Sequence, residues 1–140
     1  MKRSKIWILL SLVGLIILSV LCVRWFTMRI NTDFASEALL EFYYDDISIS
    51  VTITDEDELL LLKQILNGRL YFRSDLHCGF TTDVSVTMTN GKKSITFCPA
   101  NDGCPLLRIG TSRRYLELST ESLAKLHEIL GKYGMFFPCV

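Results

Sequence analysis

The chain has 140 residues, 49% of them hydrophobic, and a formal net charge of zero. These averages hide a division, because five basic residues flank an apolar N-terminal stretch and all 15 acidic residues follow it. The remaining part, about 110 residues, has the size of one domain. It holds ten basic and 15 acidic residues, a formal charge of −5. This charge argues against nucleic acid and against an anionic lipid surface as partners of the domain.

The N-terminal stretch between Ile6 and Val23 contains 18 consecutive uncharged residues. As a helix it would be about 27 Å long, close to the roughly 30 Å hydrocarbon layer of a bilayer. Trp7 and Trp25 lie at its two ends, where aromatic rings favour the level of the lipid headgroups. We therefore predict a transmembrane helix over about residues 6–26 within an anchor segment 1–30, and a lipid bilayer as its partner.

The basic residues around this stretch predict its orientation. Lys2, Arg3 and Lys5 precede it, whereas Arg24 and Arg29 follow it. This excess places the N-terminus in the cytoplasm, and residues 31–140 outside, under the positive-inside rule. A cleaved signal peptide is the main alternative, but no A-x-A-like site follows the apolar run. The chain is thus predicted to be a single-pass signal-anchor protein of the cell membrane.

The first half of the domain predicts two strands and a helix. Residues 39–44 are interpreted as a strand, although Phe34, Ala38 and Phe42 also fit a helical stripe. The eight residues 47–54 alternate strictly between apolar and hydroxyl side chains, which indicates a strand with one buried face. Residues 55–58 are four carboxylates at the start of an apolar stripe, and Asn67-Gly68 follows it. We interpret the four as the first turn of a helix rather than as an acidic binding patch.

The second half predicts two strand pairs and a closing helix. Asn90-Gly91 separates two alternating runs and indicates a hairpin with a two-residue turn. That turn would place Val86 opposite Ile95. Strands at 107–109 and 116–118 follow, and then a helix capped by Ser119. The predicted fold class is α+β: a two-layer domain whose antiparallel sheet carries two helices on one face, in the order ββαββββα.

The domain holds four cysteines, an even number that is typical of disulfides outside the cytoplasm. Four thiols allow three pairings. The expected positions at the ends of neighbouring strands favour Cys98 with Cys104, which leaves Cys78 with Cys139. Zinc binding that includes His77 is an alternative, but no C-x-x-C motif occurs. A thiol-redox site is weakened by the same absence.

Two further groups are candidate binding residues. The loop Asn101, Asp102 and Gly103 lies between two cysteines and offers a carboxylate and an amide, although these residues are also typical of turns. Arg108, Arg113 and Arg114 form a basic cluster that could receive an acidic partner surface, although charged residues also guard exposed strands. No nucleotide-binding, zinc-protease or serine-hydrolase motif occurs in the sequence, which favours a non-enzymatic role and predicts no cofactor or metal.

These observations favour a membrane-anchored binding or regulatory module outside the cytoplasm, with a protein or another cell-envelope component as partner. A cysteine-based metal-binding or thiol-redox domain is the alternative from a different class. A small envelope enzyme that uses Asp102 or His77 is the third hypothesis.

Overall fold

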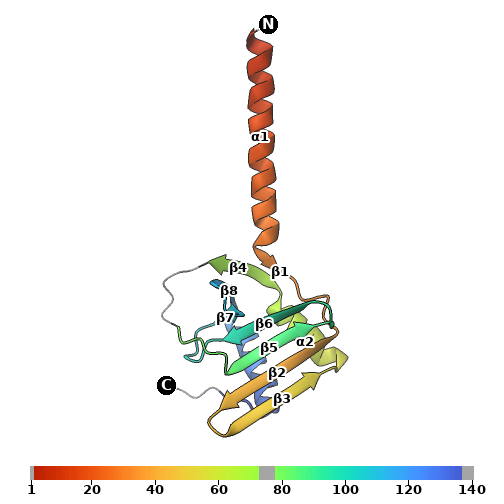
Figure 1. The fold of residues 1–140 in the computed structure, drawn as a ribbon, viewed down its shortest axis with the longest axis vertical. Helices are drawn as coiled ribbons and strands as arrows, with labels where there is room; N and C mark the ends of the chain where they lie inside the picture. Colours follow the sequence, from red (N-terminus) through yellow and green to blue (C-terminus); the bar gives the residue numbers. More distant parts are fainter. Residues whose placement is uncertain (1, 73–77, 137–140) are drawn as a thin grey trace.

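A long N-terminal helix, α1 (Lys2–Thr27), projects from a domain built on one sheet (Figure 1). The computed structural model describes residues 2–72 and 78–136. Within α1, the stretch Ile6–Trp25 is long and apolar enough to cross a membrane, and none of it is buried against the rest of the chain. A signal sequence near the N-terminus would meet the same criterion. The predicted apolar helix is confirmed, and its orientation stays a prediction.

The domain contains one eight-stranded sheet in which all neighbouring strands are antiparallel. In space the strands follow the order β1-β4-β8-β7-β6-β5-β2-β3. The two edges differ, because β1 has two residues and lies beside α1, whereas β3 has seven residues and lies at the far end (Figure 1). The strand bounds are β1 Arg29–Ile30, β2 Glu37–Tyr44, β3 Ile47–Ile53, β4 Gly68–Phe72, β5 Val84–Thr89, β6 Ser94–Pro99, β7 Leu106–Ile109 and β8 Arg114–Glu117.

Two helices, α2 (Glu56–Leu66) and α3 (Thr120–Lys132), lie on the same side of this sheet (Figure 1). The core forms between them and the sheet, because every second strand residue points toward the helices. Leu40 and Val86 are neighbours on β2 and β5 and have no exposed surface. Leu62 of α2 and Leu126 of α3 belong to the same buried cluster. The predicted α+β class with an antiparallel sheet is confirmed.

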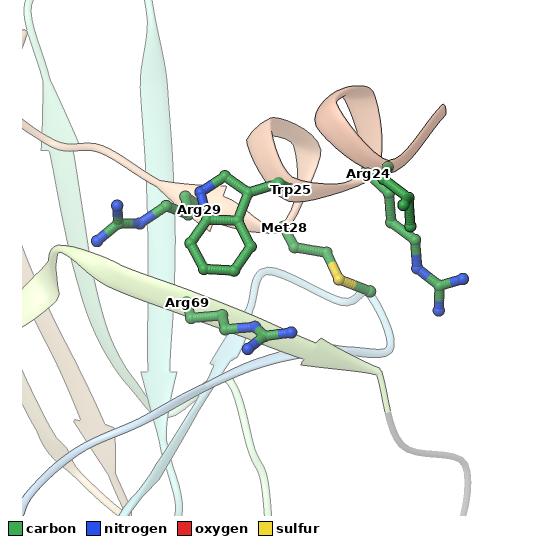
Figure 2. Close-up of a pocket in the computed structure, with 6 residues that line it drawn as sticks. Arg24, Trp25, Met28, Arg29 and Arg69 are labelled. Atoms are coloured by element: carbon green, nitrogen blue, oxygen red, sulfur yellow. The ribbon is translucent and has the colours of Figure 1, made fainter. Parts of the chain in front are cut away.

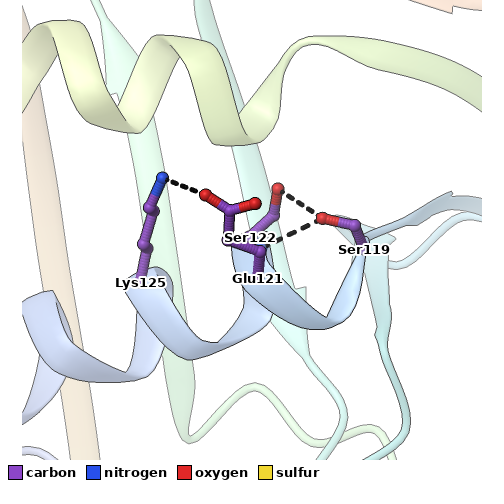
Figure 3. Close-up of polar contacts among 4 residues, drawn as sticks. All are labelled: Ser119, Glu121, Ser122 and Lys125. Atoms are coloured by element: carbon purple, nitrogen blue, oxygen red, sulfur yellow. Dashed lines mark hydrogen bonds and ion pairs between the residues drawn. The ribbon is translucent and has the colours of Figure 1, made fainter.

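Both domain helices begin at the residues that the sequence indicates. The Asp55 carboxylate accepts a hydrogen bond from the Glu58 backbone N–H at 3.0 Å and caps α2. The Ser119 hydroxyl caps α3 in the same way, accepting from the Ser122 backbone N–H at 3.1 Å (Figure 3). Such caps satisfy backbone donors that have no partner inside the helix. One turn further, α3 is supported on its exposed side by an ion pair between Glu121 and Lys125, also visible in Figure 3.

The predicted hairpin between β5 and β6 forms, but the predicted register is wrong. Val86 lies opposite Phe97, not Ile95, and Thr89 lies opposite Ser94. The connection is a four-residue loop because the Asn90 side chain accepts hydrogen bonds from the backbone N–H groups of residues 92 and 93. Only Gly91 then needs a positive φ, of 79°. The observed register differs from the predicted one by two residues. Because side chains alternate between the two faces of a strand, this shift leaves each side chain on its predicted face, and apolar residues still lie opposite apolar residues.

The order ββαββββα omits two strands, β1 and β4. β4 follows α2 directly, so the Asn67-Gly68 pair does not end the helix through a left-handed glycine. Gly68 instead allows close packing, because a Cβ built there would lie 2.6 Å from the Leu116 Cδ1 atom. The Asn67 side chain accepts from the backbone N–H and the hydroxyl of Thr32 and donates to the Asp33 carboxylate. The asparagine thereby fastens the segment after β1 to the start of β4.

Candidate functional site: the free edge of the sheet

The predicted ligand loop holds its own shape with its polar groups. The Asp102 carboxylate accepts hydrogen bonds from the backbone N–H groups of Gly79 and Cys104, each at 3.1 Å. The Asn101 amide donates to the Thr81 hydroxyl at 3.0 Å. The Asn101 Oδ1 atom is buried and accepts no hydrogen bond from the described residues. Gly103 adopts a φ of 76°, as a tight turn requires. These contacts fit the turn interpretation of the loop, and ligand binding by it stays a prediction.

The cysteine pairing differs from the expected one. Cys78 and Cys104 lie at disulfide distance, with Cα atoms 6.3 Å apart, so the predicted pair of Cys98 with Cys104 is not formed. The predicted partner of Cys78, Cys139, lies outside the described residues, as does His77. Cys98 is a buried free cysteine, and its burial raises the pKa of the thiol despite the nearby Arg108. The sequence suggested the wrong pair because strand ends that are close along the chain need not point toward each other.

The predicted basic cluster separates into an engaged and an exposed part. Arg108 is half-buried on the face of the sheet that carries no helix, and its guanidinium donates to the backbone carbonyls of Gly110 and Thr81. It also lies 5.6 Å from the centroid of the Phe80 ring. Arg113 and Arg114 are exposed at the turn and the start of β8. Arg108 therefore holds the 79–83 segment on the sheet, whereas the other two remain available to a partner.

The far edge of the sheet is the most open backbone surface among the described residues. β3 pairs along its whole length with β2, from Ile47 opposite Tyr44 to Ile53 opposite Ala38, and no strand among residues 2–72 and 78–136 pairs with its other side. Alternate backbone N–H and C=O groups of an edge strand point outward without a strand partner. Ser48, Ser50 and Thr52 are exposed on the face without helices. The strand contains no proline and no charged residue, the residues that usually prevent another strand from pairing with such an edge.

No family model, curated protein or solved structure matches this chain.

The two ends of β3 are strongly acidic. Asp45 and Asp46 form the two-residue turn before the strand, and Asp55, Glu56 and Asp57 follow it at the start of α2. All five are exposed, and none forms an ion pair with a basic group of the described residues. Glu58, the next carboxylate, differs, because hydrogen bonds from Lys132 and Tyr133 lower its pKa. Five exposed carboxylates without an ion pair among the described residues, one of them the cap of α2, thus border a seven-residue strand whose outer side is open to pairing.

This surface could have been found in the sequence. Residues 31–58 contain nine carboxylates and no lysine or arginine, and the alternating strand lies in the middle of that segment. The acidic group at 55–58 was interpreted only as a helix start, which Asp55 confirms. The sequence does not reveal that β3 lies at an edge of the sheet, because the order of strands depends on contacts between distant segments. A strand flanked by acidic residues can pair with a partner segment at the edge of a sheet, whereas in the centre both of its sides are already paired.

Proposed function

We propose that this protein is a single-pass membrane protein whose domain, outside the cytoplasm, binds an extended segment of a partner protein along β3. The partner segment adds a ninth strand to the sheet and carries basic residues near its ends. Main-chain hydrogen bonds supply affinity in such strand addition, and side chains supply specificity. The observation that carries the proposal is a seven-residue edge strand, without proline or charged residues, between two groups of exposed carboxylates.

The charge pattern favours a basic partner over a second copy of this chain. If two β3 strands paired antiparallel about Ser50, the aspartates before one strand would meet the acidic helix start after the other. Like charges that face each other across strands are destabilising. A segment with lysine or arginine at its ends would instead meet opposite charge at both ends. Complementary charge also accelerates the encounter of two partners and rejects wrong ones.

The location outside the cytoplasm is supported by two independent features. More basic residues precede the apolar stretch of α1 than follow it, which favours a cytoplasmic N-terminus. Cys78 and Cys104 lie at disulfide distance, and persistent disulfides belong to oxidising compartments. In this orientation α1 holds one edge of the sheet at the membrane, and β3 faces away from it (Figure 1). The free edge is then accessible to a segment of another envelope protein.

A peptide-binding experiment tests the proposal. The full chain in detergent micelles is titrated with a fluorescent eight-residue peptide of alternating valine and threonine with a lysine at each end. The comparison peptides have glutamate ends, or keep the lysines and carry N-methyl groups on alternate amides. Binding of the lysine peptide is expected, with loss of affinity for both comparison peptides. Equal binding of the N-methylated peptide would show charge attraction without strand addition and would overturn the proposal.

Matched variants locate the binding surface. Thr54→Lys places a positive charge at the end of the edge strand, where a peptide lysine would lie opposite it, and should weaken binding of the lysine peptide about fivefold, which corresponds to about 1 kcal/mol of like-charge repulsion. Ser94→Lys adds the same charge to β6, away from the edge, and should change affinity less than twofold. Equal effects of both substitutions, or a dimer of the free chain that Thr54→Lys dissolves, would contradict the assignment.

A second candidate function rests on the cysteine pair. The ligand atoms of Cys78, Asp102 and Cys104 lie within 4.8 Å of one another. In the reduced state two thiolates and a carboxylate are a ligand set that zinc accepts. Reduction of the pair, followed by metal analysis after exposure to Zn²⁺, distinguishes the two functions. Stoichiometric zinc in the reduced chain, lost in Asp102→Asn, would favour the metal-binding alternative.

A further inference from the structure

Three exposed apolar side chains lie together beside the start of β3, on the face of the sheet that carries the helices. Tyr44 and Ile47 are direct partners across β2 and β3, and each is 45% exposed. Phe136, which follows α3, is 41% exposed. Its ring centroid lies 5.0 Å from that of Phe42 and 5.3 Å from that of Tyr44. We call Tyr44, Ile47 and Phe136 the apolar patch.

The burial of β3 on this face decreases toward the apolar patch. Ile53, at the end of the strand, is 2% exposed, whereas Ile49 is only partly buried and Ile47 is exposed. On the neighbouring strand, Phe42 lies opposite Ile49 and is 1% exposed. A Cβ built on Gly134 would lie 3.6 Å from the Ile49 Cδ1 atom, so the chain after α3 still contacts β3 at this level. The row of core side chains is therefore incomplete only along the outer strand.

The opposite edge of the sheet does not suit the same partner segment. Its outermost strand, β1, has only two residues. Arg29 of β1 lies opposite Arg69 of β4, and Figure 2 shows Arg69 facing the Trp25 ring, whose centroid lies 5.5 Å from the guanidinium carbon. A segment with basic ends would meet like charge there. Charge thus directs such a segment to β3, the edge that also carries the apolar patch.

We propose that the segment that pairs with β3 runs antiparallel to it and carries an aromatic residue opposite Ile47, next to its C-terminal basic residue. This inference rests on the proposed strand addition. All neighbouring strands of the sheet are antiparallel. Residues opposite each other in such a pair point to the same face, where an aromatic side chain also reaches diagonal neighbours.

In this register the aromatic ring lies over Ile47 and reaches the rings of Tyr44 and Phe136. It covers the apolar patch and continues the row of core side chains that β3 leaves incomplete. The next residue of the segment, which is basic, lies opposite the exposed Asp46. Main-chain hydrogen bonds along an edge select no sequence by themselves, whereas side-chain contacts do. A buried aromatic anchor is the side chain that most often supplies such selectivity.

Three peptides of nine residues test this placement on the full chain in detergent micelles. In each, a lysine at both ends encloses seven residues that alternate between valine and threonine and begin and end with valine. Phenylalanine replaces the last valine, opposite Ile47, in the second peptide, and the first valine, opposite Ile53, in the third. The second peptide should bind about fivefold more tightly than the first, the upper range for an aromatic pair across strands. The third, with the same composition as the second, should bind within twofold of the first.

Two tyrosine variants identify the surface that the phenylalanine contacts. Tyr43 and Tyr44 are adjacent on β2 and point to opposite faces, and Tyr43 has a similar exposure of 47%. Threonine at either position retains a high preference for strands. Tyr44→Thr should remove the fivefold advantage of the second peptide, and so should Phe136→Ser. Tyr43→Thr, the matched control, should retain it.

The outcomes separate this inference from the strand addition on which it rests. Equal affinities of the three peptides for wild type, or an equal loss in both tyrosine variants, would overturn the aromatic placement and leave strand addition standing. Tighter binding of the third peptide would overturn the antiparallel direction. A dimer of the free chain that Tyr44→Thr dissolves would assign the apolar patch to a second copy and overturn the proposal. If none of the three peptides bound, strand addition would be overturned as well.

Discussion

The clearest consequence of the fold for stability concerns Asn67, the side chain that joins the segment after β1 to the start of β4. Its Oδ1 atom accepts hydrogen bonds from the Thr32 backbone N–H at 2.6 Å and the Thr32 hydroxyl at 2.7 Å. Its Nδ2 atom donates to the Asp33 carboxylate at 2.8 Å. Thr32 has no exposed surface, so Asn67→Ala would leave two of its donors buried without a partner. Each such group costs about 1–3 kcal/mol, and we expect a loss of about 3 kcal/mol in unfolding free energy.

The assay is urea unfolding of the full chain in detergent micelles, followed by far-UV circular dichroism, with equal slopes required before free energies are compared. Asn31→Ala is the matched control, because Asn31 is exposed and its side chain accepts one local hydrogen bond, from the Asp33 backbone N–H. Its cost should stay below about 0.5 kcal/mol, as for most surface changes. If Asn67→Ala cost less than 1 kcal/mol, or no more than the control, the Asn67 hydrogen bonds would not hold the segment after β1 to the start of β4.

Three further predictions concern packing, pH and thiol chemistry. Gly68→Ala should cost about 1–3 kcal/mol, because the added methyl group would overpack against Leu116. Gly131→Ala, at a helical position with open space around it, should stabilise the chain by about 0.5–1 kcal/mol. Equal stabilities of the two variants in urea unfolding would contradict the close packing at Gly68. Glu58→Gln should destabilise the domain at pH 7 but not at pH 2. The partners of Glu58 lower its pKa, so its contribution is present above the unfolded value of about 4.3 and is lost as pH falls through the lower folded value; a gap that persists at pH 2 would refute this. Cys98 should resist maleimide at pH 8 in the folded chain and react once urea unfolds it, as peptide mass mapping would show; equal rates would mean that the thiol is accessible.

The elements that the sequence predicts well are those with a strong local pattern. The alternation over residues 47–53 defines β3, and the hydroxyl of Ser119 marks the start of α3. The same is true of α1, whose apolar run needs no tertiary partner to be recognised. In each case the local sequence pattern favours the same element that the folded chain contains. Local information is then sufficient.

The missed features depend on contacts between segments that are distant in sequence. β4 is short, and three of its five residues are exposed, so it has no alternation that indicates a strand. The Asn67-Gly68 pair resembles the usual end of a helix. In the fold, however, Gly68 is required because Leu116 on β8 approaches too closely for a side chain. Asn90-Gly91 is the strongest short hairpin signal, yet the asparagine side chain closes a longer loop. None of these contacts is visible before the sheet is assembled.

The candidate site was missed for a related reason. The acidic residues around β3 and the exposed hydroxyls of Ser48 and Ser50 were evident, but their meaning depends on β3 being an edge strand. The arginines beside the end of α1 likewise come from positions 24, 69 and 114, which have no common motif. Charge composition predicted an acidic domain, and the fold separates that charge into an acidic edge far from the anchor and a basic one beside it.

Hydrogen–deuterium exchange of the full chain, with and without the lysine-ended peptide, tests the proposed strand addition at β3 most directly. In the free chain, backbone amides of β3 that point outward should exchange rapidly, because no strand covers them. Saturating peptide should slow exchange at alternate residues within 47–53 and leave the central strands β5 and β6 unchanged. Protection that appears elsewhere on the domain, or no protection in β3 at saturation, would contradict the proposed function.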